Sequence, residues 1–421
     1  MPLFRKPKHF FQYFVQRSVD EIYYSVGLRR FGVQLIGLYE PIYLYTFFNK
    51  NISFVLFFFA AILLGHSLLA PLGGRLMAKI GTKRSMLVSI PFLITYYLLF
   101  FFSEKVFFLI FLAPIAAMIS RVTFLPAFHA DFAKLSTKKN RGKQLGIMNI
   151  ITLLGSVIGP LLGAFVLVKY GFSVLFIIIA ILFFLSAIPL MTTLKTKPRY
   201  RDSYQSAWKL VAKKGWRKKS VSLMLYGAES GVNLTYWPLF LFILAISYSE
   251  LGAISSISLV FSLAIILYSS RLTDRVDKIK VFRSGCFIAS LGNLLKVFVW
   301  NPVSAVITQI FFRIGDTLDT TPLTAYIYDK TQKEKLSVGR FIVFREIVQN
   351  MGTALVYIIG GIVFLFVSQE YIYLFFIVSS LSVFFAGILA KSFNENFITN
   401  LENIKKKANE HINIKIEQES K

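Results

Sequence analysis

The amino-acid sequence predicts an all-α polytopic membrane protein whose twelve transmembrane helices form two six-helix halves. Three observations predict this class: an apolar composition, apolar blocks long enough to cross a bilayer, and basic residues concentrated in alternate loops. Of the 421 residues, 55% are hydrophobic and 16% are charged, and the mean hydropathy is +0.62. Soluble domains carry about 25% charged residues, so this composition excludes a soluble protein.

The apolar blocks give the spans in chain order, because a transmembrane helix needs about 20 mostly apolar residues. The first six lie near 22–48, 51–73, 84–103, 106–133, 144–168 and 172–193. The next six lie near 220–247, 250–270, 281–300, 303–328, 338–367 and 371–391. We therefore expect an N-terminal half at 1–193 and a C-terminal half at 220–391. A basic cytoplasmic linker, 194–219, joins them, and a cytoplasmic tail, 392–421, follows.

The basic residues set the topology. A net charge of +26 would suggest nucleic-acid binding in a soluble protein, but here the charges lie mostly in short loops. With both termini in the cytoplasm, the basic residues of the outer loops are only Lys50, Lys105 and Lys169. This asymmetry is the positive-inside rule. It predicts a multi-pass protein of the cytoplasmic membrane and excludes nucleic acid as a partner.

The linker between the halves is strongly basic. It contains ten Lys and Arg residues, one acid, Asp202, and two tryptophans, Trp208 and Trp216. Such a segment suits a basic helix lying on the anionic inner leaflet of the bilayer. The alternative is a regulatory or partner-binding site.

An internal repeat supports the division into halves. The segment 74–84 after the second span is similar to 270–280 after the eighth, at an offset of 196 residues. Arg121 in the fourth span and Arg313 in the tenth are related in the same way, 192 residues apart. Duplicated halves are typical of secondary transporters, whose substrate sites lie between the repeats near the membrane midplane.

The first loop of this repeat carries the residues of a known motif, G-x-L-a-D-r-x-G-r-r/k. The matching positions are Gly74, Leu76, Lys79, Gly81, Lys83 and Arg84. The loop resembles the signature of the major facilitator superfamily, except that Ala78 replaces the acid. The second copy, with Arg271, Asp274 and Arg275, keeps the acid and loses both glycines. The resemblance implies a facilitator fold in which both loops act in gating.

Two further spans resemble this family. Arg121 is similar to the arginine of its fourth-span motif, although Phe124 and Leu125 replace the Gln and Gly of that motif. The fifth span is similar to the signature of drug:proton antiporters at Gly155, Gly159, Pro160 and Gly163. Small residues also serve helix packing in membranes, so packing alone and an antiport-specific role both remain open.

Charged side chains recur in every third span. An ionisable group inside the bilayer costs about 2.5–3.5 kcal/mol, which makes it a functional candidate. The candidate cavity residues, on spans one, four, seven and ten, are Gln34, Glu40, Arg121, Glu229, Asn233, Arg313, Asp316 and Asp319. The resemblance implies that these four helices line the central cavity.

Spacing refines two of these assignments. Arg313 and Asp316 are three residues apart, so they share a helix face and can pair; the alternative role is a purely structural ion pair. Glu40 has no cation within one turn. It therefore either carries a proton or a cation, or reaches the outer interface.

The other ionisable residues of the spans are expected near the membrane edges. Arg29 and Arg30 should snorkel to the inner interface, and His129 and Asp131 should lie at the cytoplasmic mouth. Span eleven breaks the pattern with a polar group whose members are Arg345, Glu346, Gln349 and Asn350.

These features predict a secondary transporter that works by alternating access and exports hydrophobic or cationic small molecules in exchange for protons. The antiporter-like fifth span, the acids of spans one and seven and the abundance of aromatic residues favour this function. The alternative is a proton symporter or uniporter for a sugar or another small organic solute. A multispan membrane enzyme or a lipid scramblase is the hypothesis from a different class.

No enzymatic activity, cofactor or metal site is expected. The four histidines are scattered, and the single cysteine, Cys286, excludes an intramolecular disulfide. The sequence also lacks the G-x-x-x-x-G-K-[ST] loop that binds nucleotide phosphates. The expected partners are a small-molecule substrate, protons and a bilayer with an anionic inner leaflet, and the chain is expected to be a monomer.

Overall fold

The computed structural model describes residues 24–135, 141–191, 200, 202–333 and 338–393, and these form helices and turns without a strand. The first span is a helix at 24–36 followed by α2 (Glu40–Phe47). The rest of the first half contains α3 (Ile52–Ile80), α4 (Thr82–Ser103), η1 (Phe107–Leu112), α5 (Ala113–Leu135) and α6 (Arg141–Met191). A short helix, α7 (Tyr204–Ala212), follows.

The second half begins with α8, whose residues overlap the end of the predicted linker. Its elements are α8 (Arg217–Gly231), the π-helical turn η2 (Val232–Tyr236), α9 (Trp237–Ile243), α10 (Tyr248–Arg275), α11 (Lys278–Leu295), η3 (Lys296–Phe298), α12 (Pro302–Lys333), α13 (Val338–Phe366), η4 (Gln369–Tyr373) and α14 (Leu374–Leu389). Among the described residues, each predicted span is occupied by one helix or by two short helices in series. The predicted all-α polytopic fold is therefore confirmed.

Two glycines separate helices that run directly into one another. Gly171, with a φ of +79°, divides α6 into the fifth and sixth predicted spans. Gly81, with a φ of +94°, lies between α3 and α4. Side chains with a Cβ disfavour this region of backbone conformation, so a glycine at each position allows the chain to reverse within one residue.

Seven helical segments of the described chain are long and apolar enough to cross a membrane by length and composition alone. The first span and the α8–α9 span are not among them, because each is broken into shorter helices. The helix α12 is also missing from this set, because it contains Arg313, Asp316 and Asp319. The first span, the α8–α9 span and α12 carry all the predicted cavity residues except Arg121, which lies on α5 within this set. The helix α10 is also outside the set and carries none of them.

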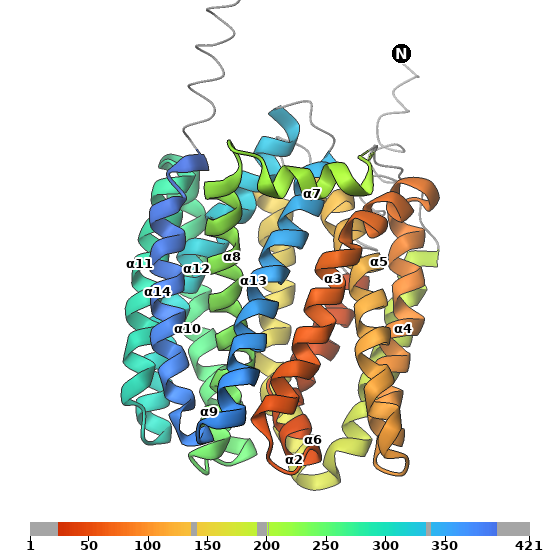
Figure 1. The fold of residues 1–421 in the computed structure, drawn as a ribbon, viewed down its shortest axis with the longest axis vertical. Coiled ribbons are helices and arrows are strands. Elements are labelled where there is room, and N and C mark those ends of the chain that lie inside the picture. Colours follow the sequence, from red (N-terminus) through yellow and green to blue (C-terminus); the bar gives the residue numbers. More distant parts are fainter. Residues whose placement is uncertain (1–23, 136–140, 192–199, 201, 334–337, 394–421) are drawn as a thin grey trace, which may run out of the picture.

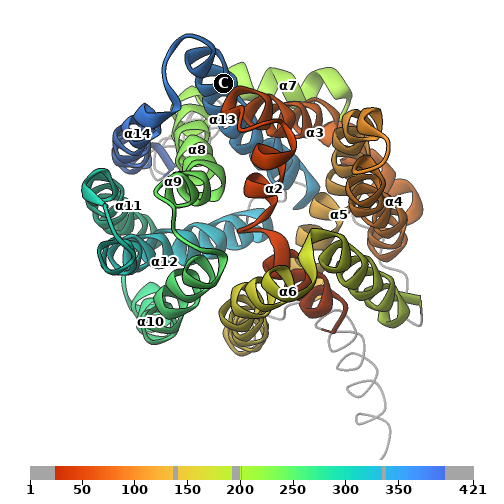
Figure 2. The ribbon, with the colours of Figure 1, turned by 90° about the horizontal axis from the view of Figure 1, so that it is seen from below.

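The two halves lie side by side. The helices α3 to α6 gather on one side of the bundle and α8 to α12 with α14 on the other (Figure 2). The halves pack against each other through α3 with α13 and α6 with α10. The helix α7 lies across one end of the bundle, which we call the α7 end (Figure 1). The opposite end, where α2 contacts α9, is called the α2 end.

Candidate functional site

Polar side chains of the described spans gather in three groups, named after a central acid: the Glu40, Glu346 and Glu229 clusters. The Glu40 cluster lies within the first half. Tyr96 donates a hydrogen bond to Glu40 Oε1 at 2.6 Å, and Tyr97 donates to Oε2 at 3.0 Å. Both tyrosines, on α4, are buried. Glu40 forms no ion pair with any other described residue. Two neutral hydroxyl groups therefore hold its carboxylate inside the first half, away from the outer interface.

Gln34 lies apart from this cluster, against α6. A Cβ added at Gly159 would lie 2.7 Å from Gln34 Cβ, and one added at Gly163 would lie 2.1 Å from the carbonyl oxygen of Leu35. The space at Gly155 is bounded less tightly, by Phe31 at 3.6 Å. The glycines of the antiporter-like segment therefore permit close packing of α6 on the first span.

Tyr39 extends this contact to the second half. It lies in the break at 37–39, and its hydroxyl donates to the carbonyl oxygen of Pro160 at 2.7 Å and to that of Tyr248 at 3.4 Å. Tyr39 has no exposed surface. The antiporter-like proline thus lies where α6, the first span and α10 meet.

The expectation that Arg29 snorkels to the interface is wrong. Arg29 is only 8% exposed, and its guanidinium donates to Ser89 Oγ and Ser120 Oγ, each at 3.3 Å. The guanidinium carbon also lies 3.7 Å from the centre of the Phe124 ring. Two neighbouring helices, α4 and α5, therefore satisfy this cation within the bundle, through hydrogen bonds and a cation–π contact. Such partners lie far away in sequence, which is why the position of Arg29 alone suggested the interface.

Asp131 is also buried, and not solvated as its position near the end of span four suggested. It has no exposed surface, and Thr82 donates a hydrogen bond to its Oδ1 at 2.7 Å. This bond ties the end of α5 to the start of α4.

The Glu346 cluster joins the two halves. His66 Nε2, on α3, lies 3.1 Å from Glu346 Oε2, on α13. His129 Nε2, on α5, lies 3.8 Å from Glu346 Oε1. Asn350 donates to Glu346 Oε2 at 3.3 Å, and Arg121 donates to Asn350 Oδ1 at 3.1 Å. One carboxylate of the second half is therefore surrounded by three polar side chains of the first half and by an amide of its own helix.

The sequence signal for this cluster was incomplete. Glu346 and Asn350 stood out as polar residues of span eleven, and Arg121 was a predicted cavity residue. His66 was only one of four scattered histidines, because nothing local relates position 66 to position 346. Its location in an otherwise apolar stretch of α3 was the available signal.

The Glu229 cluster lies within the second half, at a distorted part of the helix. Asn233 donates to Glu229 Oε1 at 2.8 Å and to the Glu229 carbonyl oxygen at 3.1 Å. Asn233 belongs to the π-helical turn η2, and such turns are frequent at functional sites. Lys296 Nζ donates to Asn233 Oδ1. A single amide therefore links a carboxylate to an ammonium group.

Lys296 is a buried cation of this cluster that the sequence pattern does not single out. It has no exposed surface, and its Nζ lies 4.6 Å from the centre of the Trp237 ring and 3.8 Å from that of Phe312. It lies in η3, directly after α11 and near the predicted end of span nine. A lysine beside two aromatic rings from other helices can only be recognised once those helices are placed.

The predicted residues of span ten form two separate contacts. Arg313 Nη1 and Asp316 Oδ2 form the ion pair that their spacing predicts, at 3.1 Å, and both side chains are about 30% exposed, at 28% and 31%. Asp319 is 1% exposed and accepts hydrogen bonds from Tyr226 at 3.0 Å and Thr320 at 3.1 Å. Asp316 is therefore neutralised locally, whereas Asp319 is held by hydroxyl groups alone.

The predicted gating residues of the first loop occupy different positions. Gly74 is buried at the contact between the halves, where an added Cβ would lie 2.8 Å from Val343 Cγ2. Lys79 and Arg84 are exposed at the α7 end, and Gly81 forms the turn described above. In the second copy, Arg271, Asp274 and Arg275 belong to α10 by backbone, but their side chains lie outside the described residues.

Residues from the linker fill the contact between the halves at the α7 end. The buried ring of Tyr200 lies between two glycines: a Cβ added at Gly74 or at Gly339 would be 3.0 Å from it. Asp202 Oδ2 pairs with Arg340 Nε of the second half at 3.2 Å. The Asp202 carbonyl oxygen accepts a hydrogen bond from Arg75 of the first half at 3.3 Å. Asp202 is thus an acid at the contact between the halves, bound to the loop in which Ala78 replaces one.

Burial, together with the neighbouring Asp202, raises the pKa of Tyr200 to about 12. The ring therefore stays neutral at physiological pH, and it contributes to this contact by packing.

Comparisons with known proteins agree with the fold. The sequence model of the Major Facilitator Superfamily matches residues 22–228 and 220–410. Curated protein sequences give no significant match. Among the described residues, no group of three His, Cys, Asp or Glu side chains could hold a metal ion.

Solved structures share the fold at low sequence identity. The fucose:proton symporter FucP of E. coli has a TM-score of 0.63 and 14% identity, over 89% of this chain and 97% of that one. The human organic anion transporter MFSD10 (TETRAN) has a TM-score of 0.64 and 13% identity, over 91% and 100%. A bacterial homologue of the human drug peptide transporters PepT1 and PepT2 has a TM-score of 0.64 and 14% identity, over 93% and 99%.

Proposed function

The chain belongs to the Major Facilitator Superfamily, and from this premise we propose that it is a proton-coupled secondary transporter of the cytoplasmic membrane. Its two halves would rock against each other around a central site, so that the site opens to one side of the membrane at a time. In the proposed topology the α7 end and both termini face the cytoplasm, in accordance with the positive-inside rule. The protein would act as a monomer, with the linker at 194–219 between the halves.

The observation that carries proton coupling is a set of carboxyl groups, buried for Glu229 and Asp319 and half-buried for Glu40, that no cation among the described residues neutralises directly. Glu40, Glu229 and Asp319 form no ion pair with any described residue, and the contacts described for their carboxylates come from hydroxyl or amide groups. An unpaired ionised carboxylate inside a membrane is costly. Binding a proton or a cation removes this cost, so occupancy of such a group and the conformation around it become coupled.

The charge balance of the interior supports the same proposal. The three clusters, together with Arg29, Asp319 and the Arg313–Asp316 pair, contain four basic side chains and five carboxyl groups, with the histidines counted as neutral. The cavity residues predicted from the sequence contain two cations and four acids, because Arg29 was expected at the inner interface and Lys296 was not among the candidates. The revised set is one positive charge short of neutrality, which a single proton or a monovalent cationic substrate would supply.

Export of hydrophobic or cationic small molecules by proton antiport is the substrate assignment that we propose. The antiporter-like segment of α6 contacts both halves through Pro160 and Tyr39, so it lies where a rocking motion would act. Aromatic side chains surround the Glu40 and Glu229 clusters, including Tyr96, Trp237 and Phe312. Aromatic faces bind cations and apolar rings alike.

Proton symport of a sugar or another small polar solute is the second candidate. The structure brings two amides, Asn233 and Asn350, into polar clusters in the membrane, and Trp237 lies beside the first of them through Lys296. Amide and aromatic groups of this kind suit a neutral polyol. The fold similarity to a fucose:proton symporter is compatible with this candidate.

The two candidates give opposite directions of solute movement in one experiment. Purified protein in liposomes would be given an imposed pH gradient and tested with lipophilic cations and with neutral sugars. We expect lipophilic cations to move against the proton flux, and the collapse of the gradient to stop this movement. Sugar moving with protons would favour the second candidate, and transport that ignores the gradient would contradict proton coupling altogether.

A further inference from the structure

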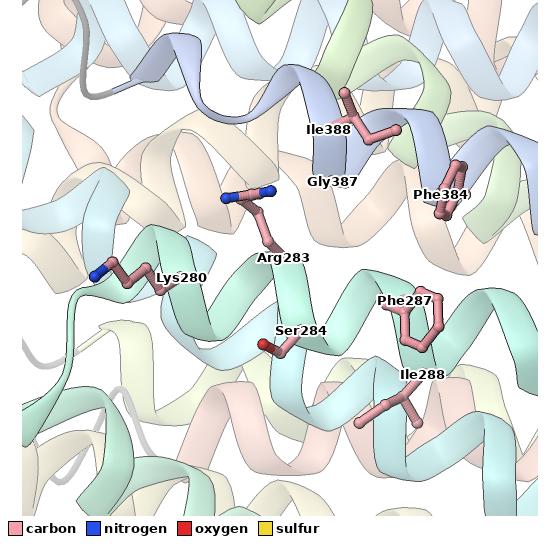
Figure 3. Close-up of a pocket in the computed structure, with 8 residues that line it drawn as sticks. All are labelled: Lys280, Arg283, Ser284, Phe287, Ile288, Phe384, Gly387 and Ile388. Carbon is pink, nitrogen blue, oxygen red and sulfur yellow. The ribbon is translucent and has the colours of Figure 1, made fainter.

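A pocket with a volume of about 470 Å³ lies between α11 and α14, outside the interior described above (Figure 3). Its polar lining comes from α11 and consists of Lys280, Arg283 and Ser284. Its apolar lining consists of Phe287 and Ile288 from α11 and Phe384 and Ile388 from α14. Phe287, Phe384 and Ile388 are exposed large hydrophobic side chains within spans, so the pocket opens to the surrounding lipid.

The spacing of the lining residues makes this face continuous. The α11 residues fall at intervals of three and four, which places them on one side of the helix. On α14, Gly387 faces the same gap, and a Cβ added there would lie 2.8 Å from Cys286 Cβ. The glycine lets the two helices approach closely at the floor of the pocket, while the larger side chains on either side form its walls.

Within the described part of the chain, the basic residues of the pocket have no acidic partner. Neither Lys280 nor Arg283 forms an ion pair or a side-chain hydrogen bond with another described residue. Arg283 Nε is buried and lacks a hydrogen-bond acceptor. The guanidinium group of Arg283 points toward α14, across the gap between the helices (Figure 3). A buried donor without an acceptor is costly, and an anion in the pocket would satisfy it.

The order of the side chains along the helix matches an amphiphile. Lys280 and Arg283 lie in the first turns of α11, at the α7 end of the bundle. Phe287 follows Arg283 by four residues, and at 1.5 Å of rise per residue it lies about 6 Å deeper in the bilayer. The positive charges therefore lie at the level of the lipid headgroups and the apolar walls at the level of the acyl chains.

We propose that this pocket binds an anionic phospholipid from the leaflet at the α7 end, which is the inner leaflet in the proposed topology. The phosphate accepts hydrogen bonds from Lys280, Arg283 and Ser284, and an acyl chain packs on Phe287 and Phe384. Free phosphate offers the same acceptor atoms but leaves the apolar walls uncovered, so the lipid is the occupant that uses the whole site.

Native mass spectrometry of the full chain in detergent tests this assignment, with phosphatidylglycerol and phosphatidylcholine as probes. We expect phosphatidylglycerol to be retained, and K280Q/R283Q to weaken its binding about 30-fold, since each basic residue near the surface contributes about 1 kcal/mol. K213Q/K214Q removes the same charge from exposed lysines at the same end and should bind normally. S284W fills the pocket from an exposed position without removing charge, and it should also lose the lipid.

Several results would overturn the proposal. Equal retention of phosphatidylcholine would show that the charge is irrelevant, and an equal loss in K213Q/K214Q would show that the attraction is not local. Displacement of the lipid by millimolar inorganic phosphate would identify a free anion as the occupant. If K280Q/R283Q fails to fold, normal lipid binding by S284W still contradicts the site. Binding is measured without transport, so these results are independent of the proposed function.

Discussion

His66 Nε2 and Glu346 Oε2 lie 3.1 Å apart, and they belong to different halves of the protein. The contact is fully buried between α3 and α13, and Ser67 extends it by donating to the carbonyl oxygen of Ile347 at 2.7 Å. A polar contact inside an apolar interface is specific in position, because a shift of the helices would leave its buried polar groups without partners, which is costly. We infer that it fixes the register in which the two halves meet.

Glu346→Gln tests this contact. The amide keeps the shape of the side chain but loses the charge that His66 and the neighbouring Arg121 face, so we expect the free energy of unfolding to fall by about 1–3 kcal/mol. Thermal unfolding in detergent measures the loss. Glu370→Gln, at an exposed residue of η4, is the matched control. Equal stability of the two variants would show that the contact between His66 and Glu346 does not stabilise the protein.

Glu229→Gln and Glu40→Gln test proton coupling. A glutamine cannot bind and release a proton, so we expect each variant to lose transport driven by a pH gradient and to keep substrate exchange at equilibrium. Gradient-driven uptake and exchange are measured on the same liposomes. Asp316→Asn is the comparison, because Asp316 is already paired with Arg313. If both glutamine variants retain full gradient-driven transport, the coupling group lies elsewhere.

Tyr226→Phe should lower the free energy of unfolding more than Arg313→Ala does, although only Arg313 carries a charge. The Arg313–Asp316 pair is about 30% exposed, so solvent screens it and its loss should cost at most about 1 kcal/mol. Tyr226→Phe removes a hydrogen bond from Asp319, which is 1% exposed, and should cost about 1.5–3 kcal/mol. Unfolding measurements in detergent compare the two, and the reverse order would contradict this assignment.

Asp202→Asn should loosen the contact at the α7 end. The ion pair with Arg340 is partly exposed, at 18% for Asp202 and 35% for Arg340. Its loss should therefore cost about 1 kcal/mol, which shifts the equilibrium between the closed and the open α7 end about fivefold toward the open form. Limited trypsin cleavage within the basic linker at 194–219 reports on this change. Glu250→Gln, at the start of α10 on the α2 end, should leave the cleavage rate unchanged. If the cleavage rate is also unchanged in Asp202→Asn, the ion pair between Asp202 and Arg340 does not hold the α7 end closed.

A reporter fused after Lys197 should lie in the cytoplasm, and one fused after Lys169 should lie on the opposite side of the membrane. The reason is the positive-inside asymmetry. Alkaline phosphatase activity, which requires export, separates the two fusions. Swapped locations would invert the proposed topology.

The fold could be predicted from the sequence because its signals are local and repeated. Each apolar block is long enough to define its own helix, and the duplicated loops at 74–84 and 270–280 indicated the pairing of halves. The ion pair of Arg313 and Asp316 was accessible for the same reason, since both residues lie on one helix.

The partners of Arg29, His66 and Lys296 could not be predicted in this way. Each of them has a hydrogen-bond or ion-pair partner on another helix, 60 to 280 positions away along the chain. Which faces meet depends on how the helices rotate and cross, and that is determined by packing across the whole bundle. For the same reason the sequence showed the acid Asp202 in the linker without indicating that it pairs with Arg340.

Cys286 is the chain's single cysteine, and it is 1% exposed where α11 packs on Gly387. Thiol reagents in solution therefore meet no reactive group on the native protein. Cysteines introduced one in each half, for example in place of the exposed residues Lys105 and Glu370, could carry spin labels without first removing the natural thiol. The distance between such labels would follow the opening of the α2 end directly, in a protein that differs from the natural chain at only two positions.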